Sequence, residues 1–594
     1  MPICPSALLK GSSTEYLKSR QGCKTCKIRK VKCGEEKPYC TRCTSTGRKC
    51  EYEGTISMVD NPFSLSQNIV WRERRSFAYY IQQTAPSVGG GLDVTFWSTI
   101  IPQLCRNEPA MWDAIITIGA LFESPEPCPD RISIRRGNSR TFNQDHRDAL
   151  FWYSRSVSAI RQQIERGRLD MLVGLISCLL FICIESIQGG VEEASQLYGQ
   201  GVHLILAFRA QIAAKIVPSA NASLLEDVIV PIFLRLGSIA VPLSALQVGS
   251  LLGEIKHTLA PEFNSLKSAR DGIVLIAAEI HGFEGECIEY LREPDTSDKL
   301  LTLTRQQSTL SARLKTWHSA FVNLVDSLRR RRDLSPQQIG IGALLFASHE
   351  ALLIILRICL SSTETDADAY IPNFQNIVEQ SEIALDATAR PDGTQPPYTV
   401  ELSVGFPLWF TCLRCREPRI RRTALALLRR APRVLGFYKT RSVFTFGEQV
   451  MALEERYGMA MNSIQARASS AVLKSPHPPS RYQQGSQGTG SEVSKFDLST
   501  LVTAPDDANI ASIYSMPAGF ENSISTSMLI PEEARIGPIK IFRPKDGLPQ
   551  GTTEKDIAKW KPSHDQLFLR LTWNERDLFT DTWRRVHKYI PTTL

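Results

Sequence analysis

The sequence of 594 residues lacks a long apolar run free of charged side chains. Its longest uninterrupted apolar stretch, residues 171–184, has 14 residues, whereas a membrane-spanning helix needs about 20. The longer segment 339–360 carries His349, Glu350 and Arg357. The first residues also lack the sustained apolar core of a secretory signal. We therefore expect a soluble intracellular protein with reduced thiols, in which residues 171–184 form a buried helix.

Net charge is absent from all but one short segment. Residues 20–50 hold ten Lys or Arg and two acids, and the rest of the chain holds 59 bases and 59 acids. The whole excess of +8 therefore lies within these residues, which indicates an anionic partner for this segment. The hydrophobic fraction of 43% is enough for a large core and excludes a wholly disordered chain.

Cysteine is sparse except in the same basic segment, which contains six of the 15. Their spacing is C-x2-C-x6-C-x6-C-x2-C-x6-C, formed by Cys23, Cys26, Cys33, Cys40, Cys43 and Cys50. A C-x2-C pair presents two thiolates to one tetrahedral ion. Because six thiolates cannot supply four separate ligands to each of two ions, two sulfurs must be shared. We predict a compact cluster with two Zn²⁺ that takes the place of an apolar core.

Other cysteine chemistry fits this spacing poorly. A redox C-x2-C site is typical of an alternating strand–helix pattern, which does not surround these residues. A treble-clef, RING or ribbon finger needs eight ligands, or four with longer spacing. The doubled pair with three equal six-residue gaps therefore favours the two-zinc cluster.

The spacing resembles the fungal binuclear zinc cluster, a six-cysteine DNA-binding domain. The resemblance implies that Cys23 and Cys40 bridge the two metal ions. It assigns Cys26 and Cys33 to one zinc, and Cys43 and Cys50 to the other. It also implies two short helices after the C-x2-C pairs, related by a pseudo-two-fold axis and joined by a proline-containing loop, here Lys37–Pro38.

The same resemblance implies how DNA is recognised. In this family the end of the first helix enters the major groove and reads a CGG triplet. The matching base-reading positions are Lys30, the principal reader, and Arg29. Lys27, Lys32 and Gln21 match positions that contact phosphates. Glu35 stands where a phosphate-contacting lysine is common. Lys and Arg are suited to guanine O6 and N7, and phosphate contacts make the affinity fall with salt.

The fold class predicted for the rest of the chain is mostly α. Residues 53–70 form a linker in which Gly54 and Pro62 interrupt any heptad pattern, so no coiled coil is expected. From 71 to 468 apolar residues recur every three or four positions, for example at Phe374, Ile377 and Leu385. Prolines such as Pro86 and Pro231 predict helix breaks.

Four stretches in this region resemble the fungal-specific transcription factor domain that accompanies these zinc clusters. They begin at Trp71, Glu108, Arg416 and Glu448. The resemblance supports a large all-α domain of helical hairpins rather than any activity.

No enzyme signature stands out in the helical region, which has no nucleophile elbow, P-loop or zinc-protease motif. We interpret the neighbouring His349 and Glu350 as structural, and Cys412 and Cys415 as buried thiols. The arginine-rich stretch 414–433 predicts an amphipathic helix with an exposed basic face, whose charges pair within the protein; the alternative is contact with DNA.

The remaining segments are predicted from composition. Residues 1–19 and 469–561 are expected to be disordered, the second because it is rich in Ser, Pro, Gly and Gln. Residues 562–594 are predicted to form an amphipathic helix that docks on the core or on a partner, with Leu567, Leu571 and Trp583 on one side.

Together these features predict a nuclear, zinc-dependent and sequence-specific DNA-binding regulator of RNA polymerase II genes, acting as an activator and not as an enzyme. The alternatives are a repressor or accessory regulator with the same DNA-binding module, and a ligand sensor or enzyme housed in the α-domain. The expected partners are double-stranded DNA and the transcription machinery, with no membrane. The protein binds as a monomer or forms a homodimer through the α-domain.

Overall fold

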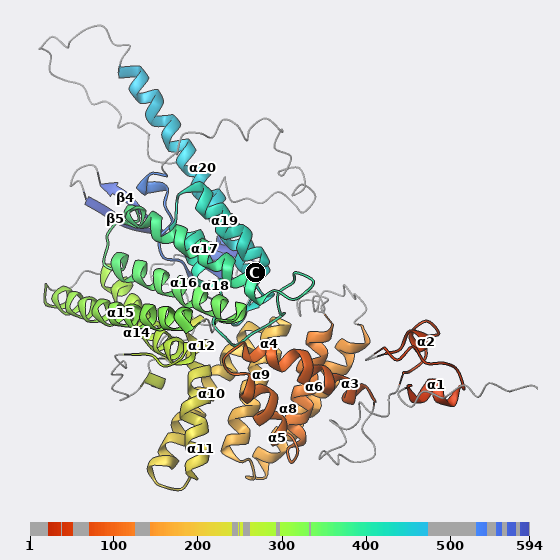
Figure 1. Cartoon of the computed structure of the whole chain (residues 1–594). Helices are drawn as coiled ribbons and strands as arrows, with labels where there is room; N and C mark the ends of the chain where they lie inside the picture. Colours follow the sequence, from red (N-terminus) through yellow and green to blue (C-terminus); the bar gives the residue numbers. More distant parts are fainter. Residues whose placement is uncertain are drawn as a thin grey trace, which may run out of the picture.

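The computed structural model shows a small cysteine-rich module, a large helical body and a carboxy-terminal sheet (Figure 1). The residues described are 22–36, 39–50, 71–124, 143–239, 248, 250–252, 262–292, 297–331, 334–472, 530–542, 554–560, 567–577 and 582–592. Helices dominate them and strands are confined to two small sheets, so the predicted mostly α fold is confirmed. The tail 1–19 and the linker 53–70 lie outside the described residues.

The cysteine module contains the two short helices α1 (Lys24–Ile28) and α2 (Thr41–Thr44). Five of its six cysteines are buried, whereas Ile28 and Tyr39 are 71% and 52% exposed. The interior of the module therefore consists of sulfur rather than of apolar side chains.

The first core of the body is built by the helices between residues 71 and 239. These are α3 (Trp71–Tyr79), η1 (Tyr80–Thr84), α4 (Ala85–Gly89), η2 (Phe96–Ile100), α5 (Ile101–Leu104), α6 (Pro109–Glu123), α8 (Gln144–Glu165), α9 (Met171–Gln188), α10 (Val191–Ala213), α11 (Ser219–Leu224), η3 (Leu225–Ile229) and α12 (Val230–Ile239). The helix α6 packs against α3, α8 and α9, and α9 also packs against α10. Because α9 is apolar on all sides, it lies at the centre of this arrangement.

The second core is built by longer helices. These are α14 (Leu266–Arg292), α15 (Ser297–Arg331), α16 (Pro336–Ile358), η4 (Thr365–Tyr370), α17 (Ile371–Thr388), α18 (Gly405–Arg414), α19 (Pro418–Arg430) and α20 (Thr440–Val472). A hairpin of β1 (Val434–Leu435) and β2 (Tyr438–Lys439) separates α19 from α20. Trp317 of α15 is fully buried, and its indole N–H donates to the carbonyl of Ala269 at 2.8 Å, which ties α15 to α14.

Two helices of the described part of the chain, α9 and α16, are long and apolar enough to cross a membrane. Most residues of both apolar stretches are buried inside the body, 78% in α9 and 67% in α16, as in the core helices of a globular protein. The prediction of a buried helix at 171–184 is therefore confirmed.

Charged side chains from distant parts of the sequence pair inside the body. Asp93 accepts hydrogen bonds from Arg235 at 2.6 Å and from Arg270 at 2.9 Å, and Arg270 also pairs with Glu401. Both arginines are almost completely buried. Burial raises the pKa of Asp93, but the two guanidinium groups outweigh this effect and lower it. The body therefore keeps these charges ionised by pairing them.

The predicted breaks at Pro86 and Pro231 do not occur. Each proline is the second residue of a helix, α4 or α12, that continues directly from a π-helical turn, η1 or η3. The missing proline N–H falls where the change from wide to normal turn already alters the hydrogen-bond pattern, so the helical path continues.

The predicted amphipathic helix at 562–594 is wrong, because this region forms an antiparallel sheet. The sheet contains β3 (Lys540–Phe542), β4 (Leu567–Asp577) and β5 (Thr582–Thr592) in the order β3-β4-β5. Leu569 lies between Leu567 and Leu571, and Trp573 follows two positions after Leu571. Apolar residues therefore recur at every second position, which is the period of a strand. Cross-strand pairs such as Trp573 with Val586 then stabilise strands.

The prediction of a disordered linker over 469–561 is wrong for the residues described in this range. The helix α20 continues to Val472, and the region contains η5 (Glu532–Ala534), β3 and α23 (Glu554–Trp560). Residues 473–529 lie outside the described residues. The buried carboxylate of Glu532 accepts hydrogen bonds from the backbone N–H groups of Glu364 and Thr365 at 2.7 and 2.8 Å. This carboxy-terminal segment therefore docks on the second core.

Candidate metal centre and nucleic-acid interface

The cysteine module consists of two halves that repeat with an offset of 17 residues. Cys23 and Cys40 are the N-cap residues of α1 and α2. The backbone N–H of Cys23 donates to the sulfur of Cys33 at 3.3 Å, and that of Cys40 donates to the sulfur of Cys50 at 3.2 Å. Each half thus folds its third cysteine back onto its first.

The same repeat governs how the two helices end. After α1, Val31 N–H donates to the carbonyl of Cys26 at 3.1 Å, and Lys30 N–H donates to that of Lys27 at 3.2 Å. After α2, Arg48 and Gly47 make the equivalent bonds, to Cys43 at 2.9 Å and to Thr44 at 3.1 Å. Both ends are Schellman motifs, and the expected pairing of two short helices is present. Each helix begins within its C-x2-C pair rather than after it.

The residue in the left-handed conformation differs between the halves. Gly47 has φ 60° and Lys30 has φ 52°. A glycine adopts this conformation freely, whereas a lysine adopts it at a cost in free energy. The first half therefore keeps a strained lysine where the fold accepts glycine, a pattern that often marks a functional residue.

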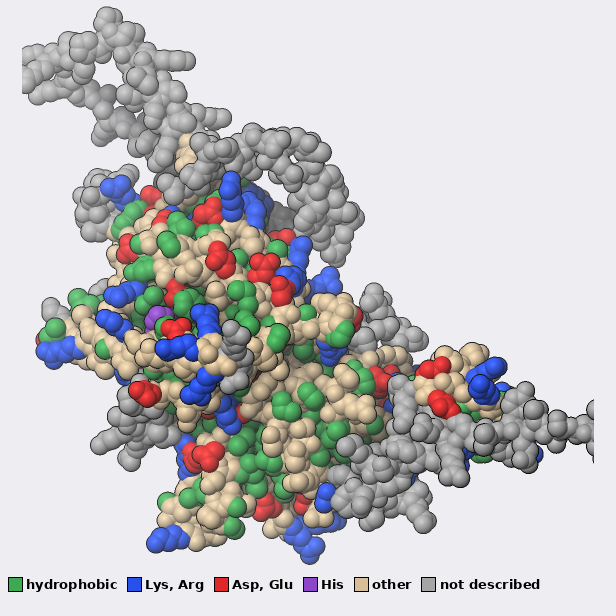
Figure 2. All heavy atoms as spheres, in the orientation of Figure 1, with side chains coloured by type: hydrophobic (Ala, Val, Ile, Leu, Met, Phe, Trp, Pro, Cys, Tyr) green, Lys and Arg blue, Asp and Glu red, His purple; other side chains and the backbone are tan. Residues whose placement is uncertain are grey.

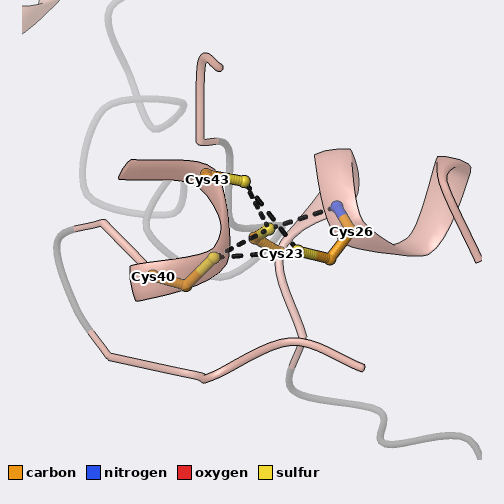
Figure 3. Close-up of side chains that lie close together, drawn as sticks. All are labelled: Cys23, Cys26, Cys40 and Cys43. Atoms are coloured by element: carbon orange, nitrogen blue, oxygen red, sulfur yellow. Dashed lines mark hydrogen bonds between the residues drawn. The ribbon is translucent and has the colours of Figure 1, made fainter. Parts of the chain in front are cut away.

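Four sulfur atoms converge between the two helices (Figure 3). The Sγ atom of Cys23 lies 3.7 Å from those of Cys40 and Cys43, and the Sγ atom of Cys26 lies 3.7 and 3.8 Å from the same two atoms. Sulfurs about 2.3 Å from a tetrahedral zinc ion would lie about 3.8 Å apart, so the donor set fits zinc. Among the described residues this is the one group suited to holding a metal ion.

The two remaining cysteines adjoin different members of this group. The Cys33 thiol interacts with those of Cys26 and Cys40, and the Cys50 thiol interacts with those of Cys23, Cys40 and Cys43. All six sulfurs therefore form one cluster, in which Cys40 adjoins both outer cysteines.

The thiols differ in acidity because some accept hydrogen bonds and others donate them. Burial raises the pKa of Cys40, but interactions with the backbone N–H and thiol of Cys43 and with neighbouring thiols outweigh it and lower the pKa to about 6. The pKa of Cys23 is also lowered, against the effect of burial, by the backbone N–H of Cys26. Burial raises the pKa of Cys50 to about 12. The thiolate form is thus favoured at the two N-cap positions.

The basic side chains assigned to DNA lie on and after α1. Lys27, Lys30 and Lys32 are exposed and Arg29 is half-buried. Figure 2 shows Lys and Arg side chains grouped on the surface of the module. Gln21 and the loop Lys37–Pro38 lie outside the described residues.

Two acidic residues, Glu35 and Glu36, lie in the central loop between Cys33 and Cys40. Glu35 is exposed and has φ 64°. The Glu36 carboxylate accepts a hydrogen bond from the backbone N–H of Thr41 at 3.1 Å, at the start of α2. This bond lowers the pKa of Glu36. Sequence reasoning assigned no role to Glu36, although an acid five residues before a helix start is a weak capping signal.

Two hydrogen bonds between the halves were also not predicted. The Thr25 hydroxyl donates to the carbonyl of Lys49 at 2.6 Å, and the Arg29 guanidinium donates to the Thr46 hydroxyl at 3.4 Å. No spacing rule signals such contacts, because they depend on how the two halves pack.

The predictions for residues of the body are largely confirmed. Cys412 and Cys415 are each 1% exposed, and burial raises their pKa values to about 12 and 11, as expected of buried thiols. His349 is buried, stacks on Trp317 and contacts Glu350 at 3.0 Å, which fits a structural role.

The arginine-rich stretch 414–433 is also paired within the protein, as predicted. Arg416 and Arg421 share the buried carboxylate of Glu454, at 2.9 and 2.7 Å. Further pairs join Arg414 to Glu364, Arg422 to Glu455 and Arg430 to Asp386.

Comparison with protein families matches residues 21–57 to the fungal Zn(2)-Cys(6) binuclear cluster domain. The converging sulfurs and the repeated halves agree with this match. The module is a fungal Zn(2)-Cys(6) binuclear cluster domain. This domain binds two zinc ions. The bound metal therefore supplies the cross-links that an apolar core would otherwise provide.

Similar curated proteins of fungi are transcription regulators. The chain is 28% identical over 265 residues to the aspercryptin biosynthesis cluster-specific transcription regulator atnN of Emericella nidulans, which covers 37% of this chain and 39% of that protein. It is 30% identical to the Zn(2)-C6 fungal-type transcription factor afumD of Aspergillus fumigatus over 19% of this chain and 35% of that protein. It is 24% identical to the transcription regulator lscL of Purpureocillium lilacinum over 33% of this chain and 52% of that protein.

These alignments span about half or less of each relative. No solved structure matches the chain.

Proposed function

We propose that the protein is a zinc-dependent, sequence-specific DNA-binding regulator of RNA polymerase II transcription that acts in the nucleus. The observation that carries the proposal is a metal-held module with a basic, exposed helix end. Between Cys23 and Cys33 there are five Lys or Arg and no acid, and between Cys40 and Cys50 there are three. The charge of the module therefore favours contact with DNA through the first half.

Cys23 and Cys40 are proposed as the sulfurs shared by both zinc ions. Cys26 and Cys33 then complete one tetrahedron, and Cys43 and Cys50 complete the other. The neighbours of Cys33 and Cys50 support this division, because each outer cysteine contacts members of its own proposed set. The low pKa of Cys40 suits a sulfur that is a thiolate ligand of two cations.

Lys30 and Arg29 are proposed to contact base edges of a CGG triplet in the major groove. Both residues directly follow α1, which ends at Ile28, and the Lys30 side chain is exposed. Lys27, Lys32 and Gln21 are proposed to bind phosphates. Glu35 replaces one cationic contact with an acid, so we expect fewer phosphates to be neutralised at the central loop.

The domain boundaries follow the same proposal. Residues 20–52 form the DNA-binding domain, and 71–468 form a fungal-specific transcription factor domain. This domain is proposed to relay regulation and to contact the transcription machinery, with a homodimer through the α-domain as the alternative to a monomer.

The direction of regulation is proposed to be activation. Repression and an accessory role are the alternatives, together with a ligand-sensing α-domain that controls the DNA-binding module. A one-hybrid assay separates activation from repression: residues 53–594 fused to a foreign DNA-binding domain raise reporter output only if the protein activates.

The substitution Lys30→Ala tests DNA reading. We expect it to weaken binding to CGG-containing DNA by about 1–3 kcal/mol, with both zinc ions retained. The loss is measured by gel-shift titration and the zinc content by mass spectrometry of the native chain. Equal affinity of the variant and the wild type would contradict the assignment.

A further inference from the structure

The helix α1 is attached to the second half of the cluster domain by side chains that do not ligate metal. The Thr25 hydroxyl donates to the carbonyl of Lys49 at 2.6 Å, and the Arg29 guanidinium donates to the hydroxyl of Thr46 at 3.4 Å. Thr25 and Arg29 are four residues apart, so they lie on one face of α1. Both reach the short segment 46–49 that follows α2. We call this pair of contacts the α1 clamp.

The α1 clamp departs from the symmetry of the two halves. With the offset of 17 residues, Arg42 and Thr46 stand at the positions equivalent to Thr25 and Arg29. The Thr46 hydroxyl donates to the carbonyl of Arg42 at 2.8 Å, so this donor bonds within its own half. The bonds donated by Thr25 and Arg29 instead cross between the halves. A feature that breaks a repeated pattern is a candidate for a role that the repeat alone does not supply.

The clamp lies directly beside the residue proposed to read DNA. Lys30 follows Arg29 and has the left-handed φ of 52°, which sets the direction in which the chain and its side chain leave the helix. The sulfur cluster holds α1 at Cys23 and Cys26, near its start, whereas the Arg29 contact holds its end. The orientation of Lys30 therefore depends on contacts at the end of α1 as well as on the metal cluster.

We propose that Thr25, through Lys49, and Arg29, through Thr46, are positioning residues that fix the angle of α1 for DNA recognition. For Arg29 this role is additional to the base contact proposed above. This inference rests on the proposed DNA-binding function and adds a specificity-determining contact to it. Neither of the clamp's hydrogen bonds involves a sulfur atom, so their loss leaves the zinc ligands in place. Without the clamp, α1 samples more orientations. Binding to DNA must then restrict these orientations, which lowers the affinity.

The test compares the full-length chain with its variants Thr25→Val and Thr25→Ser. Valine keeps the shape of threonine without the hydroxyl, and serine keeps the hydroxyl. We expect Thr25→Val to bind CGG-containing DNA about 3- to 10-fold more weakly, the size expected for one hydrogen bond, and Thr25→Ser to bind as the wild type does. Binding is measured by fluorescence anisotropy at several salt concentrations, with zinc content measured on the same samples.

Two readouts distinguish positioning from other roles. Thr25→Val removes no charge, so the dependence of affinity on salt should keep its slope, whereas loss of a phosphate contact lowers that slope by about one. The variant should also keep both zinc ions. The matched control is Thr44→Val, because the Thr44 hydroxyl donates to the carbonyl of Cys40 within its own half at 3.1 Å. This control should bind DNA as the wild type does.

The second contact of the clamp is tested through Thr46. We expect Thr46→Val to weaken binding in the wild-type background and to have no further effect when Arg29→Gln is already present. The other bond of the Thr46 hydroxyl, to the carbonyl of Arg42, lies within the second half and does not hold α1, so Thr46 acts on α1 through Arg29.

Several results would overturn the inference. They are unchanged affinity of Thr25→Val, a loss of affinity that Thr25→Ser shares, loss of zinc from Thr25→Val, or additive effects of the substitutions at 29 and 46. If the wild-type chain itself does not bind CGG-containing DNA, the proposed function fails, and the inference fails with it.

Discussion

The cluster domain and the helical body are stabilised in opposite ways. In the cluster domain the buried side chains are cysteines and the large apolar residues Ile28 and Tyr39 are exposed. In the body two cores bury apolar side chains, and buried charges such as Glu454 are matched by arginines. The first region therefore depends on thiolate chemistry and metal, and the second on apolar packing and buried ion pairs. Substitutions that damage one region should leave the other intact.

The largest effect is expected from Cys40→Ser. Its sulfur adjoins those of Cys23, Cys26 and Cys43, and structural zinc contributes on the order of 10–16 kcal/mol to small zinc domains. We expect loss of both zinc ions and unfolding of the cluster domain. The helical body should keep its circular dichroism spectrum and its Tm. A variant that retains two zinc ions per chain would contradict the bridging role.

The next effect is expected in the body from Glu454→Gln. This carboxylate is fully buried and pairs with Arg416 and Arg421, and it also accepts a bond from the backbone N–H of Ile536 at 2.6 Å. Removing the charge leaves two buried arginines without it, which costs about 3–5 kcal/mol. Urea unfolding monitors the body, and zinc content should not change.

The neighbouring Glu455→Gln is the matched control for this prediction. Its pair with Arg422 is partly exposed, and such pairs contribute about 0–1 kcal/mol. Equal destabilisation by the two substitutions would refute the role of the buried carboxylate.

The same carboxylate predicts a dependence on pH. Burial raises the pKa of Glu454, but Arg416 and Arg421 outweigh this and lower it in the folded protein. Its contribution is therefore present above the pKa of an unfolded glutamate, about 4.3, and is lost as the pH falls through the lower folded value. Wild-type unfolding below pH 4.3 should be more sensitive to pH than unfolding of Glu454→Gln.

A smaller effect is expected from Lys30→Gly, which should change stability and DNA affinity in opposite directions. Because Lys30 has a positive φ, glycine should stabilise the zinc-loaded cluster domain by about 1 kcal/mol relative to Lys30→Ala. Both variants lose the lysine side chain, so both should lose DNA affinity equally. Thermal unfolding of the cluster domain and DNA titration of the same two proteins separate stability from function.

The smallest effect is expected from Ser335→Ala at the start of α16. The Ser335 hydroxyl accepts from the backbone N–H of Gln338 at 3.2 Å, and the Gln338 side chain accepts from Ser335 N–H at 2.9 Å. Loss of this capping box should destabilise the body by about 1 kcal/mol in urea unfolding. The control Ser308→Ala, on the exposed surface of α15, should have almost no effect.

The cluster domain was predictable from sequence because its spacing alone determines which sulfurs can meet. Cys23 to Cys50 span 28 positions, and all six thiols belong to one cluster in the structure. The contacts of Thr25 and Arg29 across the halves were not predictable, because they depend on the path of the chain after α2. The same limit applies to Glu36, whose partner is set by the fold of the central loop.

The helices of the body were predictable from the sequence, but the contacts between distant residues were not. The stripe at Phe374, Ile377 and Leu385 forms the buried face of α17, as expected. The pairing of Asp93 with Arg235 and Arg270 joins residues more than 140 positions apart, and no local pattern indicates it. At the carboxy-terminal end, Leu567 and Leu571 fit a helix and a strand equally, and only pairing with residues 582–592 favours the strand.

The docking of the carboxy-terminal segment changes how deletions of this chain should be interpreted. Arg535 binds both carboxylate oxygens of Asp368, at 2.8 and 2.7 Å, and Asn574 donates to Glu532 at 2.6 Å. A truncation before residue 530 would uncover Asp368 and the start of η4. It would also remove the backbone N–H of Ile536, which donates to Glu454. Loss of reporter output in such a truncation would therefore report damage to the helical body as readily as removal of a transcriptional effector region. Point substitutions on the exposed face of β5, such as at Arg584, are the safer probes of this end.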